Sequence, residues 1–142
     1  MVGTSAYSFG KKHKLCSKAL TEELFSKGKS LFAYPFRCVY LISEPPSGDH
    51  APVQILISVS KKKHKRAVTR NLIKRRTREA YRQNMHLWGG HDSDGRILLL
   101  ALVYTSDEIL KYPEIENGIR KAIQSVKKRT GEDRGLSAGG VD

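Results

Sequence analysis

Residues 57–82 read ISVSKKKHKRAVTRNLIKRRTREAYR, and this stretch decides the fold. It begins inside Val53–Ser60, where branched apolar residues alternate with a half-polar set, as is typical of a strand with two different faces. Basic residues follow at once, and from about Val68 to about Leu87 the apolar positions recur at helical spacing. The stretch therefore predicts a strand that leads through a basic turn into a basic helix.

Nearly all of the net charge of the chain lies in this stretch. Residues 61–82 hold eleven cations and one acid, Glu79, which is a net charge of +10, and the whole chain of 142 residues carries +12. Like charges at this density repel one another, and folding alone does not compensate that cost. A polyanion does compensate it, because each neutralised phosphate releases condensed counterions. The charge therefore predicts a phosphate-rich partner.

Solvent alone or an anionic membrane surface could also face a basic run. The second half of this run is rich in arginine, whose planar fork matches phosphate better than the point charge of lysine does. The run lacks the face of Trp, Phe and Leu that a membrane-surface helix needs. DNA is less favoured than RNA, because the cations cover a wide arc and continue into a lysine-rich turn. These features favour RNA.

The expected helix presents one face with a single sign of charge. At about 100° per residue, an arc about 140° wide carries five cations and one amide. These residues are Arg70, Asn71, Lys74, Arg75, Arg78 and Arg82. Leu72 lies near the opposite, apolar side, so we expect it to pack. Arg76 interrupts that side, and the sequence leaves open whether its side chain reaches out to solvent or the helix is distorted.

The rest of the chain supplies the elements that cover this unit. The expected elements are a helix near Thr21–Lys27 that Gly28 ends, strands over Phe36–Ile42 and Ile97–Tyr104, and a helix from about Glu114 to Arg129. Lys127, Lys128 and Arg129 suit the last turn of that helix. This order predicts one α+β domain over residues 14–129, with a flexible N-terminus at 1–13 and a disordered tail at 130–142.

The sequence carries no recognisable catalytic constellation. The patterns HxxxH, CxxC, GxxxxGK[ST] and GxGxxG are missing, and no His pairs with a nucleophile and an orienting acid. The two cysteines, Cys16 and Cys38, suit reduced thiols in the cytoplasm, where we place the protein. No apolar run reaches the ~20 residues of a membrane span, and no membrane partner is expected. Any catalysis therefore belongs to a partner.

Residues 57–82 closely resemble the signature of the protein component of bacterial ribonuclease P. In that family a strand ending in Val-Ser-Lys-Lys leads into a helix built on Arg-Asn-Arg, then Ile-Lys-Arg and a further Arg. The matching positions are Ser60, Lys61, Lys62, Arg70, Asn71, Ile73, Lys74, Arg75 and Arg78. Upstream, ELFSKGKSLFAYPF at residues 23–36 resembles the end of the family's first helix, with Phe25 and Gly28 matching. The resemblance covers roughly residues 14–129.

The resemblance implies the accessory subunit of a ribonucleoprotein endonuclease that removes the 5′ leader from precursor tRNA. Hydrolysis would be carried out by the catalytic RNA, with magnesium ions held mainly by that RNA and none held by protein side chains alone. The chain by itself would not be catalytic. The residues that would engage the catalytic RNA or its ions are Arg70, Asn71, Lys74, Arg75 and Arg78. The leader cleft would be lined by Lys61, Lys62, Phe25 and Arg37, and Lys65 and Arg66 complete the expected RNA-binding set.

The resemblance also implies a two-layer α/β sandwich. Its mixed four-stranded sheet would contain a left-handed βαβ crossover around the basic helix, an exception to the usual rule. Two positions depart from the family pattern: Leu72 replaces the third motif arginine, and Thr21 stands where an aromatic residue is common. The main alternative is a ribosomal or other structural RNA-binding protein, which would show the same charge pattern. The sequence does not specify an oligomeric state, and a monomer is the default expectation.

Overall fold

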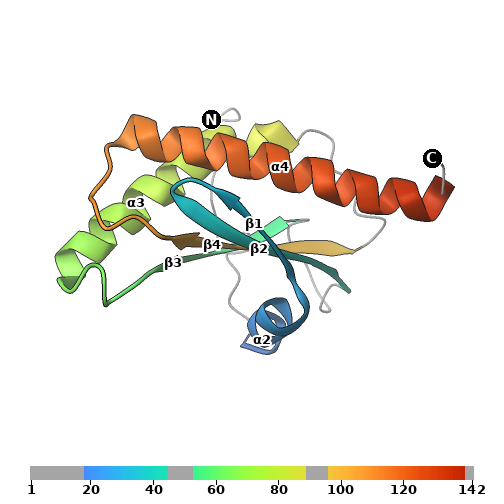
Figure 1. Ribbon diagram of the computed structural model, residues 1–142, viewed down its shortest axis with the longest axis horizontal. Coiled ribbons are helices and arrows are strands. Elements are labelled where there is room, and N and C mark those ends of the chain that lie inside the picture. The colour runs from blue at the N-terminus through green and yellow to red at the C-terminus, as the bar shows by residue number, and fades with distance from the viewer. Residues whose placement is uncertain (1–17, 45–52, 89–95, 140–142) are drawn as a thin grey trace, which may run out of the picture.

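The computed structural model describes residues 18–44, 53–88 and 96–139, with the backbone alone for residues 132–139. Figure 1 shows its elements in space. In chain order they are α2 (Lys18–Lys27), β1 (Lys29–Ala33), β2 (Phe36–Ser43), β3 (Val53–Val59), α3 (Ala67–Asn84), the 3-10 turn η2 (Met85–Trp88), β4 (Ile97–Tyr104) and α4 (Tyr112–Gly139). Among these residues, no helix is both long and apolar enough to cross a membrane.

The four strands form one mixed sheet in the order β1-β2-β4-β3. β2 pairs antiparallel with β1 and with β4, whereas β3 pairs parallel with β4. β4 therefore lies inside the sheet, with helices on both faces. Its residues from Ile97 to Leu102 are at most 1% exposed, as its uninterrupted apolar sequence predicts for a strand covered on both sides.

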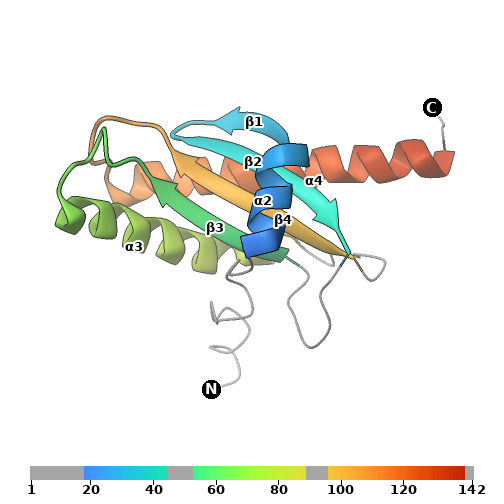
Figure 2. The same ribbon diagram turned by 90° about the horizontal axis from the view of Figure 1, so that it is seen from below.

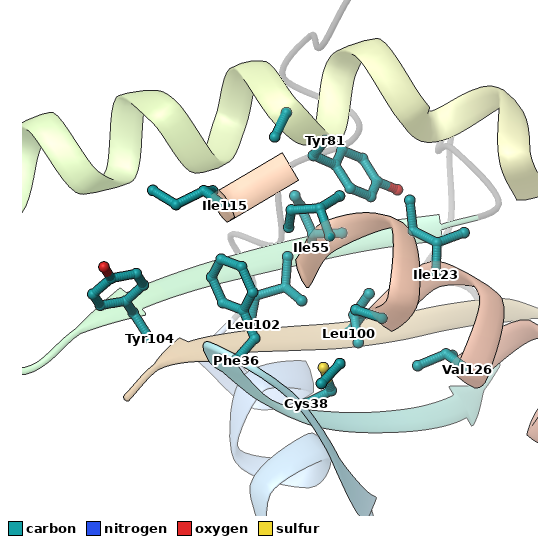
Figure 3. Close-up of a cluster of buried hydrophobic side chains, with 14 of the residues drawn as sticks. Phe36, Cys38, Ile55, Tyr81, Leu100, Leu102, Tyr104, Ile115, Ile123 and Val126 are labelled. Carbon is teal, nitrogen blue, oxygen red and sulfur yellow. The ribbon is translucent and has the colours of Figure 1, made fainter. Parts of the chain in front are cut away.

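α3 and α4 cover one face of the sheet, and α2 covers part of the other (Figure 1). The larger core lies between the sheet and the first pair of helices, where Tyr81 of α3 and Ile123 of α4 meet Leu100 and Phe36 (Figure 3). A smaller cluster lies beneath α2, around Leu24. These layers confirm the expected α+β sandwich.

The β3–α3–β4 unit crosses over in the left-handed sense. In Figure 2 α2 faces the viewer and α3 lies behind the sheet. With the arrows of the parallel strands β3 and β4 turned to point upward, β4 lies to the right of β3 in that view. From the α3 side β4 therefore lies to the left, whereas about 98% of such crossovers place it to the right. This agrees with the fold that the resemblance implied.

The expected elements are confirmed with small shifts at their ends. Gly28 ends α2 as expected, since its N–H donates to the carbonyl of Leu24 at 2.8 Å. β1 was not expected, because its five residues alternate too briefly to stand out. The expected end of the last helix at Arg129 is wrong: α4 continues to Gly139. Thr130 is only 2% exposed, so burial extends past Arg129, and the interior glycine Gly131 weakens a helix without having to end it.

Part of the expected organisation lies outside the described residues. This applies to the N-terminal segment 1–13, to Cys16, and to residues 140–142, and residues 45–52 and 89–95 are also not described. Cys38, the described cysteine, is free and fully buried. Burial raises the pKa of its thiol to about 12, so the thiol stays protonated and unreactive at neutral pH.

Candidate nucleic-acid interface

The turn between β3 and α3, residues 60–66, folds back on its own first residue. The N–H of His64 donates to the carbonyl of Ser60 at 3.0 Å, and the N–H of Lys62 donates to the Ser60 hydroxyl at 3.1 Å. Ser60, which matches the family motif, therefore fixes the conformation of the turn that carries Lys61 and Lys62.

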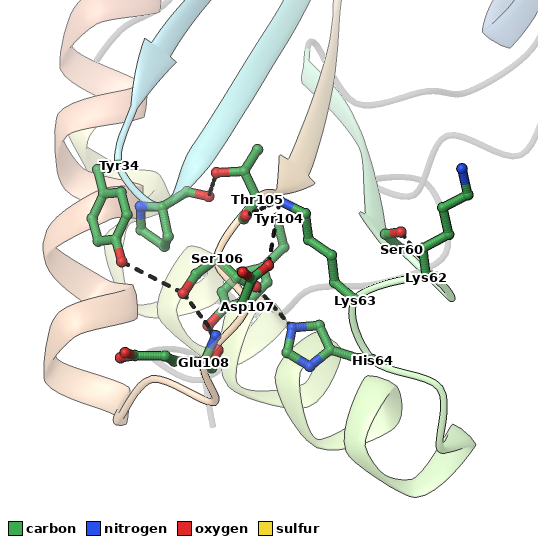
Figure 4. A network of polar contacts seen from close by, with 11 residues as sticks. Tyr34, Ser60, Lys62, Lys63, His64, Tyr104, Thr105, Ser106, Asp107 and Glu108 are labelled. Carbon is green, nitrogen blue, oxygen red and sulfur yellow. Dashed lines mark hydrogen bonds and ion pairs between the residues drawn. The ribbon is translucent and has the colours of Figure 1, made fainter.

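His64 and Lys63 tie this turn to the segment after β4 (Figure 4). The His64 side chain is 5% exposed, and its Nε2 lies 2.8 Å from the carbonyl oxygen of Ser106. A carbonyl only accepts, so Nε2 carries the proton. Lys63 Nζ donates to the carbonyl of Thr105 at 2.6 Å and lies 3.6 Å from the Asp107 carboxylate. Lys63 and His64 thus hold the turn in place against the segment after β4.

The segment after β4 is itself tied to the β1–β2 hairpin. Both the N–H and the hydroxyl of Thr105 donate to the carbonyl of Pro35, at 2.8 Å and 2.9 Å. The hydroxyl of Tyr34 lies 3.5 Å from that of Ser106, which also accepts the N–H of Glu108 at 3.0 Å. The basic turn is therefore anchored through residues 105–108 to the far strands of the sheet.

Arg70, expected at the catalytic RNA, folds back onto the same turn. Its Nη1 donates to the carbonyls of His64 and Lys65, at 3.0 Å and 2.8 Å. These bonds fix the start of α3 against the turn. Arg70 therefore has a structural role that its place in the motif did not indicate, and contact between Arg70 and RNA stays a prediction.

Arg70→Ala and Lys74→Ala are expected to separate structural from binding cations. Arg70→Ala should lower the free energy of unfolding by about 1–2 kcal/mol, because it removes two hydrogen bonds from a charged donor. Lys74, one turn later, has no side-chain partner among the described residues, so Lys74→Ala should stay within about 0.5 kcal/mol of the parent. Thermal unfolding measures both variants. Equal stability of the two would show that the Arg70 bonds contribute nothing.

The cations of residues 61–82 divide into two groups by what they contact. Four are held by acceptors of the protein: Lys63, Arg70, Arg76 and Arg82. Within the described part of the chain, the side chains of the other seven have no hydrogen bond or ion pair: Lys61, Lys62, Lys65, Arg66, Lys74, Arg75 and Arg78. All seven belong to the expected RNA-binding set.

These unpaired cations occupy two adjoining surfaces. Lys61, Lys62, Lys65 and Arg66 are exposed on the turn, and Arg75 and Arg78 are exposed on α3, where Lys74 is half-buried beside them. Asn71 is exposed on the same helix. The free charge is therefore continuous from the end of β3 along the outer side of α3.

The other side of α3 resolves two questions that the sequence left open. Arg76 reaches out of the apolar side and donates to the carbonyl of Leu110 at 2.6 Å, so the helix needs no distortion to accommodate it. Leu72 is only half-buried, and the residue at the core is Ile73, which is fully buried. Arg82 leaves the free basic face because it pairs with Glu79 at 2.6 Å, and this bond lowers the pKa of the Glu79 carboxyl.

A second candidate surface lies on the α2 side of the sheet. Strand register places Phe32, Arg37, Val103 and Ser58 in one row across all four strands. Phe32 is 61% exposed, and Arg37 is also exposed. The row lies one residue before the end of β3, so it adjoins the turn that carries Lys61 and Lys62. Arg37 thus lies in the same row as Ser58, two strands away, and its place in a leader cleft with these lysines stays a prediction.

Two aromatic residues complete the description of this surface. Phe25, expected at the cleft, lies on α2 and is 49% exposed. Phe32 was missed, because the sequence did not indicate that β1 is a strand. The alternation of Leu31 and Ala33 with Phe32 could have revealed it, since the first two are half-buried and buried. Exposed aromatics beside cations are the groups on which unpaired bases stack.

The described residues contain no group of three or more His, Cys, Asp or Glu side chains that could hold a metal ion. The free groups at both surfaces are ammonium, guanidinium, amide and aromatic. Such groups bind and orient phosphates and bases.

The model of the family called Ribonuclease P matches residues 9–127, which is most of the chain. This chain belongs to the ribonuclease P protein family. The ribonuclease P protein components of two Porphyromonas gingivalis strains are each 31% identical to it over 124 residues, covering 87% of this chain and 89% of theirs. Membership identifies a protein subunit of ribonuclease P and implies an RNA partner.

Solved structures of ribonuclease P proteins share the fold. A Staphylococcus aureus protein superposes with a TM-score of 0.60 at 23% identity, covering 89% of this chain and 92% of that one. The Thermotoga maritima protein gives a TM-score of 0.61 at 17% identity, covering 79% and 96%. The ribonuclease P protein fold is thus retained although most side chains differ.

Proposed function

We propose that this protein binds the catalytic RNA of ribonuclease P through α3 and the basic turn, and that it receives the 5′ leader of precursor tRNA on the open face of the sheet. The observation that carries the proposal is the set of seven cations without an acceptor in the described protein. Unpaired cations favour binding to RNA because they neutralise its phosphates and release the counterions condensed on them. The complex would then cleave precursor tRNA endonucleolytically.

The two surfaces suit two different parts of an RNA substrate. The outer side of α3 offers Arg75 and Arg78, and no exposed aromatic residue lies on α3 among the described residues, which suits the backbone of a folded RNA. The sheet face offers Phe32 and Arg37 next to the turn, which suits a single strand with unstacked bases. We therefore assign α3 to the catalytic RNA and the sheet face to the leader.

The chemistry is proposed to stay with the RNA. Magnesium ions held mainly by the RNA subunit would support hydrolysis, and the protein would neutralise phosphates that otherwise need additional cations. The protein should therefore lower the magnesium concentration at which the RNA is active. A ribosomal protein, the alternative from charge alone, is less well supported, because the family match spans residues 9–127.

Reconstitution with the RNA subunit of the same organism tests this function. The protein alone should leave precursor tRNA intact, and the protein with the RNA should cleave it at magnesium concentrations where the RNA alone is slow. Cleavage is followed on precursor tRNA labelled at the 5′ end. Cleavage by the pair that is no faster than by the RNA alone would overturn the proposal.

The leader assignment has its own measurement in the same assay. Phe32→Ala with Arg37→Gln should raise the KM for precursor tRNA and leave the affinity of the protein for the RNA subunit unchanged. Mature tRNA, which lacks the leader, is the control ligand. An equal loss of affinity for precursor and mature tRNA would place the leader elsewhere.

A further inference from the structure

A second group of cations lies on α4, and the length of this helix contradicts the explanation that the sequence suggested for them. Lys127, Lys128 and Arg129 suit the last turn of a helix, where cations interact favourably with the helix dipole. α4 instead continues to Gly139, so these three residues lie in its interior. The effect of the dipole falls off beyond the last turn. Their presence therefore needs another cause.

The cations of α4 gather on the side of the helix that faces away from the sheet. The buried stripe consists of Ile115, Ile119, Ala122, Ile123 and Val126. At about 100° per residue, the opposite arc, about 120° wide, carries four cations and two amides. These exposed residues are Asn117, Arg120, Lys121, Gln124, Lys127 and Lys128. Residues 117–131 contain five cations and no acid, and the acids Glu132 and Asp133 follow them, with side chains outside the described part of the structure.

In the contacts of its described side chains, this face differs from an ordinary solvated helix surface. Such surfaces mix both signs of charge, so that neighbours three or four residues apart form ion pairs. Lys127 donates to the carbonyl of Leu87 at 3.3 Å. Among the described residues, the side chains of Arg120, Lys121 and Lys128 have no hydrogen bond or ion pair. The charge on α4 is therefore as free as the charge on α3.

The position of α4 in the fold indicates which molecule reaches this face. α3 and α4 lie in the same layer, on the side of the sheet opposite α2 (Figures 1 and 2). They meet along a seam where Asn84 of α3 donates to the Glu116 carboxylate of α4 at 3.0 Å. An RNA docked on the outer side of α3 thus continues towards α4, whereas a leader on the α2 side is separated from it by the sheet.

We propose that the outer face of α4, defined by Arg120, Lys121 and Lys128, is a second docking surface for the phosphate backbone of the catalytic RNA. This inference rests on the proposed function. The face carries cations and amides and no aromatic residue, so it suits a folded RNA backbone better than unpaired bases. The RNA subunit would then contact the helical layer at two places, on either side of the seam where α3 and α4 pack together.

Lys121→Gln with Lys128→Gln tests the surface in the full-length protein, by titration of the refolded RNA subunit at several salt concentrations. Loss of two phosphate contacts should lower the magnitude of the log–log salt slope by about 1–2 and raise Kd by about 10- to 30-fold at 0.15 M salt. The matched control is Lys18→Gln with Lys27→Gln, which removes two exposed charges from α2 on the opposite side. That control should bind like the parent.

Three outcomes decide between the explanations. Equal losses of affinity in the α4 variant and the α2 control would show that only the net charge of the protein matters, and would overturn the proposal. Unchanged affinity for the RNA subunit, with weaker binding of precursor tRNA to the assembled complex, would assign the face to the substrate and overturn it as well. Failure of the parent protein to bind the RNA subunit would refute the proposed function itself, so the two failures are distinguishable.

Discussion

Arg75→Glu with Arg78→Glu is expected to weaken binding of the RNA subunit by at least about 100-fold at 0.15 M salt. Both arginines are exposed on the outer side of α3, and neither has an acceptor among the described residues. Loss of two phosphate contacts alone costs about 10- to 30-fold, and the introduced carboxylates add repulsion against the same phosphates. Because neither side chain supports the fold, the melting temperature should stay close to that of the parent.

Titration against salt measures this effect and its origin together. If about six of the seven free cations meet phosphates, the parent should show a log–log slope of about −4 to −5. The slope of the variant should be shallower by about 2. Lys18→Glu with Lys27→Glu reverses the same number of charges on α2 and should leave the affinity nearly unchanged. A parent slope near zero, or equal losses in both variants, would contradict docking of RNA on α3.

Gly118→Ala is expected to destabilise the protein by about 1–3 kcal/mol, although alanine favours a helix more than glycine does. α4 crosses the β1–β2 hairpin closely at this glycine. A Cβ atom added there would lie 2.5 Å from Cδ of Pro35 and 2.7 Å from the carbonyl oxygen of Tyr34. Real Cβ atoms do not approach other atoms so closely, and both contacts belong to the hairpin itself. The helix and the hairpin must therefore separate, which disturbs the core around Phe36.

Gly131→Ala is the matched control for this prediction. It makes the same substitution in the same helix, at a position where an added Cβ meets nothing within 4 Å. It should therefore stabilise the protein by up to about 1 kcal/mol through helix propensity alone. Unfolding can be followed through the single tryptophan, Trp88, which is 5% exposed and donates to the Tyr81 hydroxyl at 2.9 Å. A shift of the same sign in both variants would show that the close approach at Gly118 has no energetic effect.

The elements that the sequence predicted best are those whose burial follows a single period. Both ends of β4 were predicted correctly, because an uninterrupted apolar run of eight residues is typical of a strand that is covered on both faces. α3 was predicted within a few residues, because its apolar and basic residues separate at helical spacing. β1 was missed because its five residues are mostly exposed, so that alternation leaves little trace in composition.

The candidate site was predicted as a set and was refined by contacts between distant residues. Every unpaired cation of residues 61–82 was in the expected RNA-binding set. Arg70 was in that set as well. Its bonds to the carbonyls of His64 and Lys65 depend on an irregular turn, which leaves no periodic pattern in the sequence. Arg76 interrupts the apolar side of the helix, and its acceptor, the carbonyl of Leu110, lies 34 residues further along the chain.

The sequence by itself determined that the charge is concentrated, that it lies on one side of a helix after a strand, and which family the motif resembles. These properties are local, because charge and periodicity are carried by neighbouring residues. The three-dimensional structure decided which cations are free, since each acceptor is a carbonyl or carboxylate brought within reach by folding, within α3 for Arg82 and outside it for Lys63, Arg70 and Arg76. It also placed α4 in the layer of α3 and carried that helix past Arg129, and so left a second group of cations without an acceptor in the described protein.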